Sequence, residues 1–151
     1  MTVRHSKLSA AQLDAAYRAT TYRARLPTNT LALRIGQPCE ALERLLVQSD
    51  CRTWAFISAG NPGSNRLGER ENLSRHLALV AAVNQLGLIH FEGAGCPPTP
   101  DWTPERSLLI LGITRPGAHA LASRFGQSAI VFGTRGHAPE LQYVHSPREA
   151  I

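Results

Sequence analysis

Residues 53–86, TWAFISAGNPGSNRLGERENLSRHLALVAAVNQL, set the architecture of this chain. The nearly continuous apolar run over 53–59 is typical of a strand that is covered on both faces of a sheet. Residues 60–68 are rich in glycine, asparagine and serine, which predicts a loop. Apolar side chains then recur at helical spacing over 69–86, and Gly87 is a natural C-cap, so we expect the longest helix there.

The same signals divide the rest of the chain. Ser9 and Gln12 form a capping box, so the first helix is expected to begin at Ser9 and to continue to about residue 25, before Pro27. Two further helices are predicted over residues 39–49 and 115–125. Apolar runs predict the remaining strands over residues 30–35, 88–92, 107–113, 128–133 and 141–144, the last two as a hairpin.

This order of elements predicts an α/β (α+β) fold with a mixed five- or six-stranded sheet flanked by about four helices. Two pairs of strands follow one another directly, which excludes an all-parallel sheet. The length of 151 residues fits a single domain over 1–151, with an ordered core at about 9–145. A hydrophobic fraction of 43% with 18% charged residues excludes a disordered chain.

The charge is basic, and arginine supplies nearly all of it. The formal net charge is +5, and Lys7 is the only lysine. Arginine binds carboxylates and phosphates in a planar, bidentate geometry, which favours an anionic partner. Arginines spread over solvated faces are the alternative interpretation. Because basic runs and an aromatic ladder are missing, we expect no more than weak binding to nucleic acid.

Cysteine usage and hydropathy indicate a reduced cytoplasm as the expected location. The three cysteines are odd in number and widely spaced, which does not make a disulfide framework. No paired cysteine or histidine motif suggests a metal site. No stretch approaches the roughly 18 apolar residues of a membrane helix, and no signal peptide follows Met1, so no membrane partner is expected.

The loop over residues 60–66 is the best candidate for a binding site. Ligands of open α/β sheets collect where strands end, and a helix N-terminus favours anions. Arg66, Arg70 and Arg75 follow closely and add positive charge. The loop lacks the ending of a Walker loop and the glycine spacing of a dinucleotide fingerprint. A plain turn remains the alternative, because Asn-Pro and Pro-Gly are ordinary turn pairs.

Five further residues are candidates, each with a structural alternative. Glu71 is a possible base, but it also complements the helix dipole. Asn72 either binds a ligand or ties down the preceding loop. Glu105 is a second carboxylate for acid–base chemistry, and Trp102 either stacks on a planar ligand or covers the sheet edge. Gln127 lies at a helix-to-strand junction, where its side-chain amide either forms a hydrogen bond to a loop carbonyl or binds a ligand.

The chain resembles a bacterial family known as domain of unknown function 3293 over about residues 15–135. The resemblance is carried by Tyr17, Thr20, Asn61, Pro62, Ser64, Glu71, Asn72, Trp102, Glu105, Ser107, Phe125, Gly126, Gln127 and Ala129. It implies a small stand-alone bacterial protein and names no activity, substrate or cofactor.

The leading hypothesis is a site for an anionic small molecule, such as a nucleotide or phosphate ester. Glu71 or Glu105 is the candidate base, and whether any reaction occurs is left open. The alternative is a non-enzymatic module that binds RNA or a protein through a flat, arginine-lined face. The candidate ligand-binding residues are Asn61, Ser64, Asn65, Arg66, Asn72, Arg75, Trp102 and Gln127.

Overall fold

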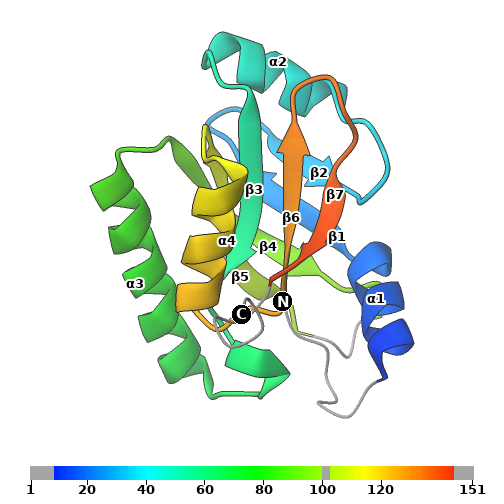
Figure 1. Ribbon diagram of the computed structural model, residues 1–151, viewed down its shortest axis with the longest axis vertical. Coiled ribbons are helices and arrows are strands. Elements are labelled where there is room, and N and C mark those ends of the chain that lie inside the picture. The colour runs from blue at the N-terminus through cyan, green and yellow to red at the C-terminus, as the bar shows by residue number, and fades with distance from the viewer. Residues whose placement is uncertain (1–8, 100–102, 145–151) are drawn as a thin grey trace.

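The computed structural model describes residues 9–99 and 103–144 (Figure 1). The helices are α1 (Ala10–Ala19), α2 (Glu40–Gln48), the short 3-10 helix η1 (Pro62–Ser64), α3 (Glu69–Leu86) and α4 (Arg115–Arg124). The strands are β1 (Thr21–Arg25), β2 (Thr30–Leu33), β3 (Thr53–Ser58), β4 (His90–Cys96), β5 (Glu105–Leu111), β6 (Ala129–Thr134) and β7 (Glu140–Tyr143).

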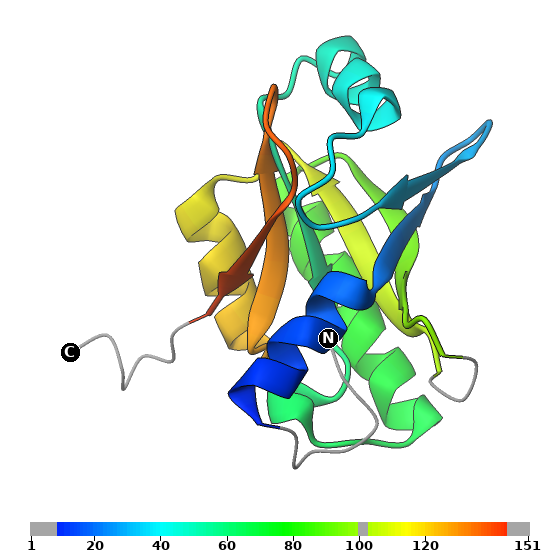
Figure 2. The same ribbon diagram turned by 90° about the vertical axis from the view of Figure 1, so that its right-hand side faces the viewer.

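The seven strands form one curled sheet in the order β2-β1-β4-β5-β3-β6-β7 (Figure 2). Every neighbouring pair is antiparallel. The α+β class and the four helices are therefore confirmed, whereas the prediction of a mixed sheet with five or six strands is wrong.

The sheet is antiparallel because the crossovers through α3 and α4 each leave room for one strand. β3 and β4, which α3 connects, run in the same direction, but β5 lies between them and pairs antiparallel with both. In the same way, α4 connects β5 to β6, and β3 lies between those two strands. Each of these two crossovers therefore connects two parallel strands, but no two parallel strands are neighbours in the sheet.

The missing strand is β1, which the sequence prediction had assigned to the first helix. α1 ends at Ala19, and Thr20 is extended with φ −75° and ψ 141°. From there burial alternates, with Tyr22 and Ala24 buried and Arg23 exposed, which is the period of a strand. The capping box at Ser9 and Gln12 is confirmed.

Both faces of the central strands are buried, as the apolar run over 53–59 predicts. Ala55 and Ile57 point toward α3 and α4, whereas Trp54 and Phe56 point to the other face, toward α1 and α2. The first core involves only β3, β5 and β6 among the strands, but the second draws on all seven. None of the helices within the described ranges is both long and apolar enough to cross a membrane.

Candidate functional site

The chain turns sharply where β3 ends, and this turn organises the site. Ser58 is the last residue of β3, and Gly60 and Asn61 follow. Asn61 is left-handed, with φ 47° and ψ 61°, a conformation that asparagine tolerates better than most residues. The loop then passes through η1 to Gly68, the N-cap of α3.

Two asparagines hold this loop against α3. The amide of Asn61 donates to Asn72 Oδ1 at 2.9 Å, and Asn72 Nδ2 donates to Asn61 Oδ1 at 2.9 Å. Asn61 Oδ1 also accepts from the amide of Leu67 at 2.8 Å. Asn72 therefore ties down the loop, which was the structural alternative considered for it.

Arg75 and Gln127 fasten the same loop to the junction between α4 and β6. Arg75 Nε donates to the carbonyl of Ala59 at 2.6 Å, and Arg75 Nη2 donates to the carbonyl of Phe125 at 2.5 Å. Gln127 Nε2 donates to the carbonyl of Gly60 at 2.9 Å. Much of the hydrogen-bonding capacity of these two side chains is thus used on backbone carbonyls.

Glu105 also lies next to Gly60. Ser58 Oγ donates to Glu105 Oε1 at 2.8 Å and accepts from the amide of Gly60 at 3.1 Å. A Cβ at Gly60 would lie 3.3 Å from both Glu105 Oε1 and Asn72 Oδ1. Glycine therefore lets a carboxylate and an amide approach the position where a larger residue would have its Cβ.

Buried polar side chains gather around Glu105. Four of the five buried polar residues within the described ranges lie at this end of the fold, and the fifth is His76. Tyr22 joins them: its hydroxyl donates to the carbonyl of Tyr17 at 2.8 Å, and burial raises its pKa, with the charge of Glu105 adding to the shift. We call this group the Glu105 cluster; it consists of Thr20, Tyr22, Ser58, Glu105, Ser107 and Gln127.

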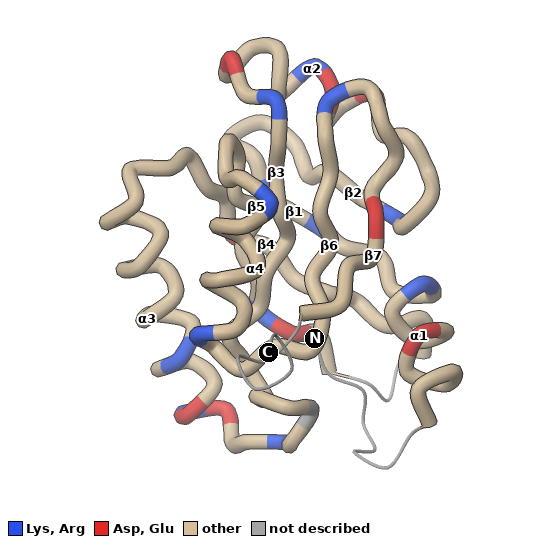
Figure 3. Tube along the Cα trace, viewed as in Figure 1, with Lys and Arg blue, Asp and Glu red and all other residues tan. Residues whose placement is uncertain are grey.

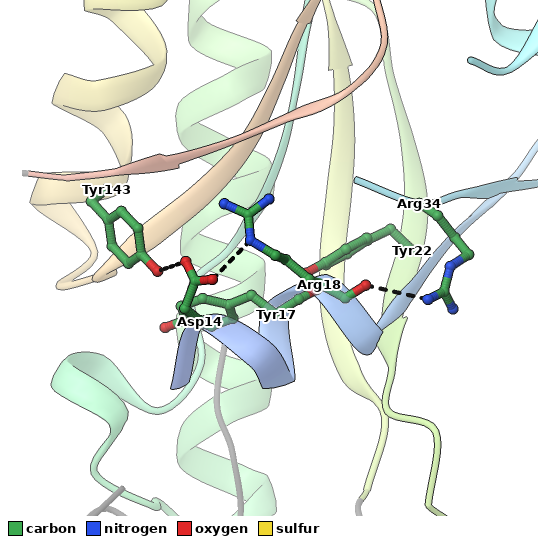
Figure 4. A network of polar contacts seen from close by, with 6 residues as sticks. All are labelled: Asp14, Tyr17, Arg18, Tyr22, Arg34 and Tyr143. Atoms are coloured by element: carbon green, nitrogen blue, oxygen red, sulfur yellow. Dashed lines mark hydrogen bonds and ion pairs between the residues drawn. The ribbon is translucent and has the colours of Figure 1, made fainter. Parts of the chain in front are cut away.

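Helix α1 closes the cluster and is held at both edges of the sheet (Figure 4). Arg34, just after edge strand β2, donates to the carbonyls of Ala19 and Arg18 at 3.2 and 3.3 Å. Tyr143 on edge strand β7 donates to Asp14 at 2.5 Å. Asp14 also pairs with Arg18 at 2.8 Å, and these two bonds, that to Arg18 first, hold the pKa of Asp14 below its usual value.

Of the remaining candidates, three are exposed and one lies outside the described residues. Asn65, Arg66 and Glu71 are exposed on the loop and on the first turn of α3. Ser64 belongs to η1. Trp102 lies outside the described residues. The structure therefore brings together Asn61, Asn72, Arg75, Glu105 and Gln127, and it places the exposed residues beside them.

Sequence reasoning did not single out Ser58 or Tyr22 as site residues. Ser58 carried a usable signal, because a serine at the end of an otherwise apolar strand marks the point where the environment becomes polar. Tyr22 carried none, because residues 21–25 were assigned to a helix. Polar groups are seldom buried without a partner or a role, so their gathering is typical of a functional site.

Comparison with known protein families gave a match over the middle of the chain. Residues 57–130 match the sequence model of a family described as "Protein of unknown function (DUF3293)". Residues 57–130 of the chain belong to the DUF3293 family. The match begins at Ile57 in β3 and ends at Ile130 in β6, so it includes the loop, Glu105 and Gln127, and it leaves out α1. No curated protein and no solved structure matched the chain.

Proposed function

We propose that this DUF3293 protein binds a small molecule with an anionic group, such as a nucleotide or a phosphate ester, at loop 60–66 and the start of α3. The observation that carries the proposal is the convergence on Gly60. The carboxylate of Glu105 and the amides of Asn72 and Gln127 reach this one residue from three separate segments of the chain. A network of this kind makes the loop rigid, and rigid placement is what a binding loop needs.

The anionic group would lie at the exposed side of the loop. Arg66 and Arg70 are exposed there and make no ion pair with the described residues. Gly68 caps α3 without a side chain, so the first-turn amides add a partial positive charge. Glu69 and Glu71 oppose this potential, and we therefore assign the charge recognition chiefly to the two arginines.

The uncharged part of the ligand would lie toward Glu105. This carboxylate is half-buried, and Ser58 holds one of its oxygens. An ionised carboxylate accepts hydrogen bonds only, so it suits a hydroxyl or amino group and would repel a phosphate. A ligand with hydroxyl groups at one end and a phosphate at the other fits both parts. If the site has a base, Glu105 is our choice, because Glu71 points to solvent.

The proposal is tested by thermal unfolding in the presence of nucleoside monophosphates and sugar phosphates. At a ligand concentration of about 100 times Kd, stabilisation of about 2.7 kcal/mol is expected, which raises Tm by several degrees. Arg66→Gln should abolish this shift with no change in the ligand-free Tm, because Arg66 is exposed.

Arg44→Gln on α2 is the matched control, since it removes the same charge from another exposed arginine and should retain the full shift. Glu105→Gln should weaken binding of compounds with hydroxyl groups more than binding of inorganic phosphate. The absence of any shift across the panel would contradict the proposal, as would equal losses in the Arg66 and Arg44 variants.

A further inference from the structure

One face of the sheet is only half covered by helices. α3 and α4 pack on β3, β5 and β6, and the core on their side contains no residue of β1, β2 or β4. The β1–β2 hairpin projects away from both helices (Figure 2). On this side Arg23, Arg25, Ala32 and Glu92 are exposed and Ala94 is half-buried. We call this surface, together with Arg106, the open sheet face.

Three arginines cross the open sheet face in a regular array. Arg23 on β1 lies opposite Ala94 on β4, and Ala94 lies opposite Arg106 on β5. Arg23 and Arg106 are therefore in one row, about 10 Å apart, and Arg25 follows Arg23 on the same side by about 7 Å. All three are exposed, and none forms an ion pair or side-chain hydrogen bond with the described residues. Figure 3 marks the basic and acidic positions along the chain.

Two exposed leucines of α3, Leu73 and Leu77, border this array of arginines. His76 Nε2 lies 2.7 Å from Glu92 Oε1, which places this side of the helix next to β4. Leu73 lies one helical turn from His76 on the same side, and Leu77 follows four residues after Leu73. Leu73 is 40% exposed and Leu77 is 58% exposed, so both present apolar surface beside the arginines.

We propose that the open sheet face docks an acidic segment of a partner protein, independently of the ligand site. Carboxylates of the segment would pair with Arg23, Arg25 and Arg106, since guanidinium groups bind carboxylates in a bidentate geometry. Its apolar side chains would contact Leu73 and Leu77. The charge is complementary, and the small Ala94 between the arginines leaves room for a chain to lie flat on the strands.

The chemistry of the surface favours an acidic protein over the other partners. Sheets that bind single-stranded RNA present aromatic rings on which bases stack, whereas the exposed side chains of β1, β4 and β5 here are arginine and glutamate. A second copy of the chain is disfavoured, because the net charge is +5 and two such faces repel each other.

The test is fluorescence anisotropy with the full chain and a fluorescein-labelled peptide of alternating Glu and Leu residues. The triple variant Arg23→Gln, Arg25→Gln, Arg106→Gln should bind this peptide at least about tenfold more weakly than the original protein. The control triple Arg44→Gln, Arg52→Gln, Arg135→Gln removes the same charge from arginines outside the open sheet face and should bind normally. Leu73→Gln should weaken binding of the Glu-Leu peptide while leaving binding of polyglutamate unchanged.

Three results would overturn the inference. The first is no binding of the peptide at low ionic strength, where charge pairing is strongest. The second is an equal loss in both triple variants, because the effect would then come from net charge alone. The third is tighter binding of labelled oligouridylate than of the peptide, which would make the face an RNA-binding surface instead.

Discussion

Tyr143, near the end of the last strand, donates a hydrogen bond to the carboxylate of Asp14 on the first helix, with 2.5 Å between the two oxygens. The rings of Tyr143 and Tyr17 also contact each other, with centroids 6.3 Å apart. Because Arg34 holds the other end of α1, this helix joins the two edges of the sheet, β2 and β7. The stability of the helix that closes the Glu105 cluster thus depends on the last strand.

Tyr143→Phe removes only this hydroxyl. We expect a loss of about 1 kcal/mol or less in the free energy of unfolding, because the bond is to a charged group but is open to solvent. Amide hydrogen exchange should accelerate in α1 more than in α3. Tyr22→Phe is the comparison: its buried hydroxyl bonds to Tyr17, so its cost should be larger. Equal exchange rates in α1 before and after Tyr143→Phe would disprove the link.

The same contact makes stability depend on alkaline pH. Burial and the bond to Asp14 raise the pKa of Tyr143 to about 12, from 10.0 in the unfolded chain. Folding therefore favours the protonated phenol, and this contribution is complete below pH 10 and is lost as the pH rises from 10 to 12. Urea unfolding at a series of pH values should show a shallower alkaline decline for Tyr143→Phe than for the original protein, and superimposable declines would refute the assignment.

At acidic pH the contribution of Asp14 to stability changes with pH in the opposite direction. The pKa of Asp14 is lowered, chiefly by the hydrogen bond from Arg18 and then by that from Tyr143. Its contribution to stability is present above its unfolded pKa of 3.8 and is lost as the pH falls through the lower folded value. Asp14→Asn should therefore flatten the pH dependence of unfolding in this acidic range. A titration of Asp14 by NMR that gives an ordinary pKa would rule this out.

Gly126 and Gly87 offer a matched pair, because both have φ of +70°. At Gly87 a Cβ meets nothing within 4 Å, so Gly87→Ala should cost only the backbone strain of about 1 kcal/mol. At Gly126 a Cβ would lie 2.8 Å from the Cβ of Pro62, so Gly126→Ala should cost about 1–3 kcal/mol more and displace the loop. Chemical denaturation measures both, and equal losses would show that Pro62 does not pack there.

Asn72→Ala tests whether the asparagine pair builds the loop. It leaves the amide of Asn61 without its partner and removes one of the two donors to Asn61 Oδ1, so we expect a loss of about 1–3 kcal/mol in the free energy of unfolding. Asn84→Ala on the exposed side of α3 is the control and should be neutral or slightly stabilising, since alanine favours helices. A neutral Asn72→Ala would mean that the loop does not need this clamp.

Local patterns were enough to locate most elements but not the sheet topology. α3 spans Glu69–Leu86 as predicted, because its apolar periodicity and its glycine C-cap are local signals. β1 was missed, because Thr20 and Thr21 fit a helical stripe as well as a strand start. The insertion of β5 between β3 and β4 depends on pairing between distant residues, which periodicity does not encode.

For the candidate site too, local sequence patterns predicted the position but not the contacts of each residue. The loop over 60–66 was predicted from its composition, and the structure places it against Glu105 and Gln127. The different roles of Arg75 and Arg66 were not predictable, because spacing does not show that Arg75 alone lies within reach of the carbonyls of Ala59 and Phe125. Sequence spacing shows which residues are near a loop. It does not show which of their side chains are already hydrogen-bonded to the backbone in the folded protein.

The ligand site is best examined by an amide NMR titration of the ¹⁵N-labelled protein with a nucleoside monophosphate or sugar phosphate from the thermal panel. We predict shifts confined to residues 60–71, Glu105 and Gln127, and their loss in Arg66→Gln but not in Arg44→Gln. Shifts centred on another part of the surface, or none at saturating ligand, would contradict the proposal that this loop and Glu105 form a binding site.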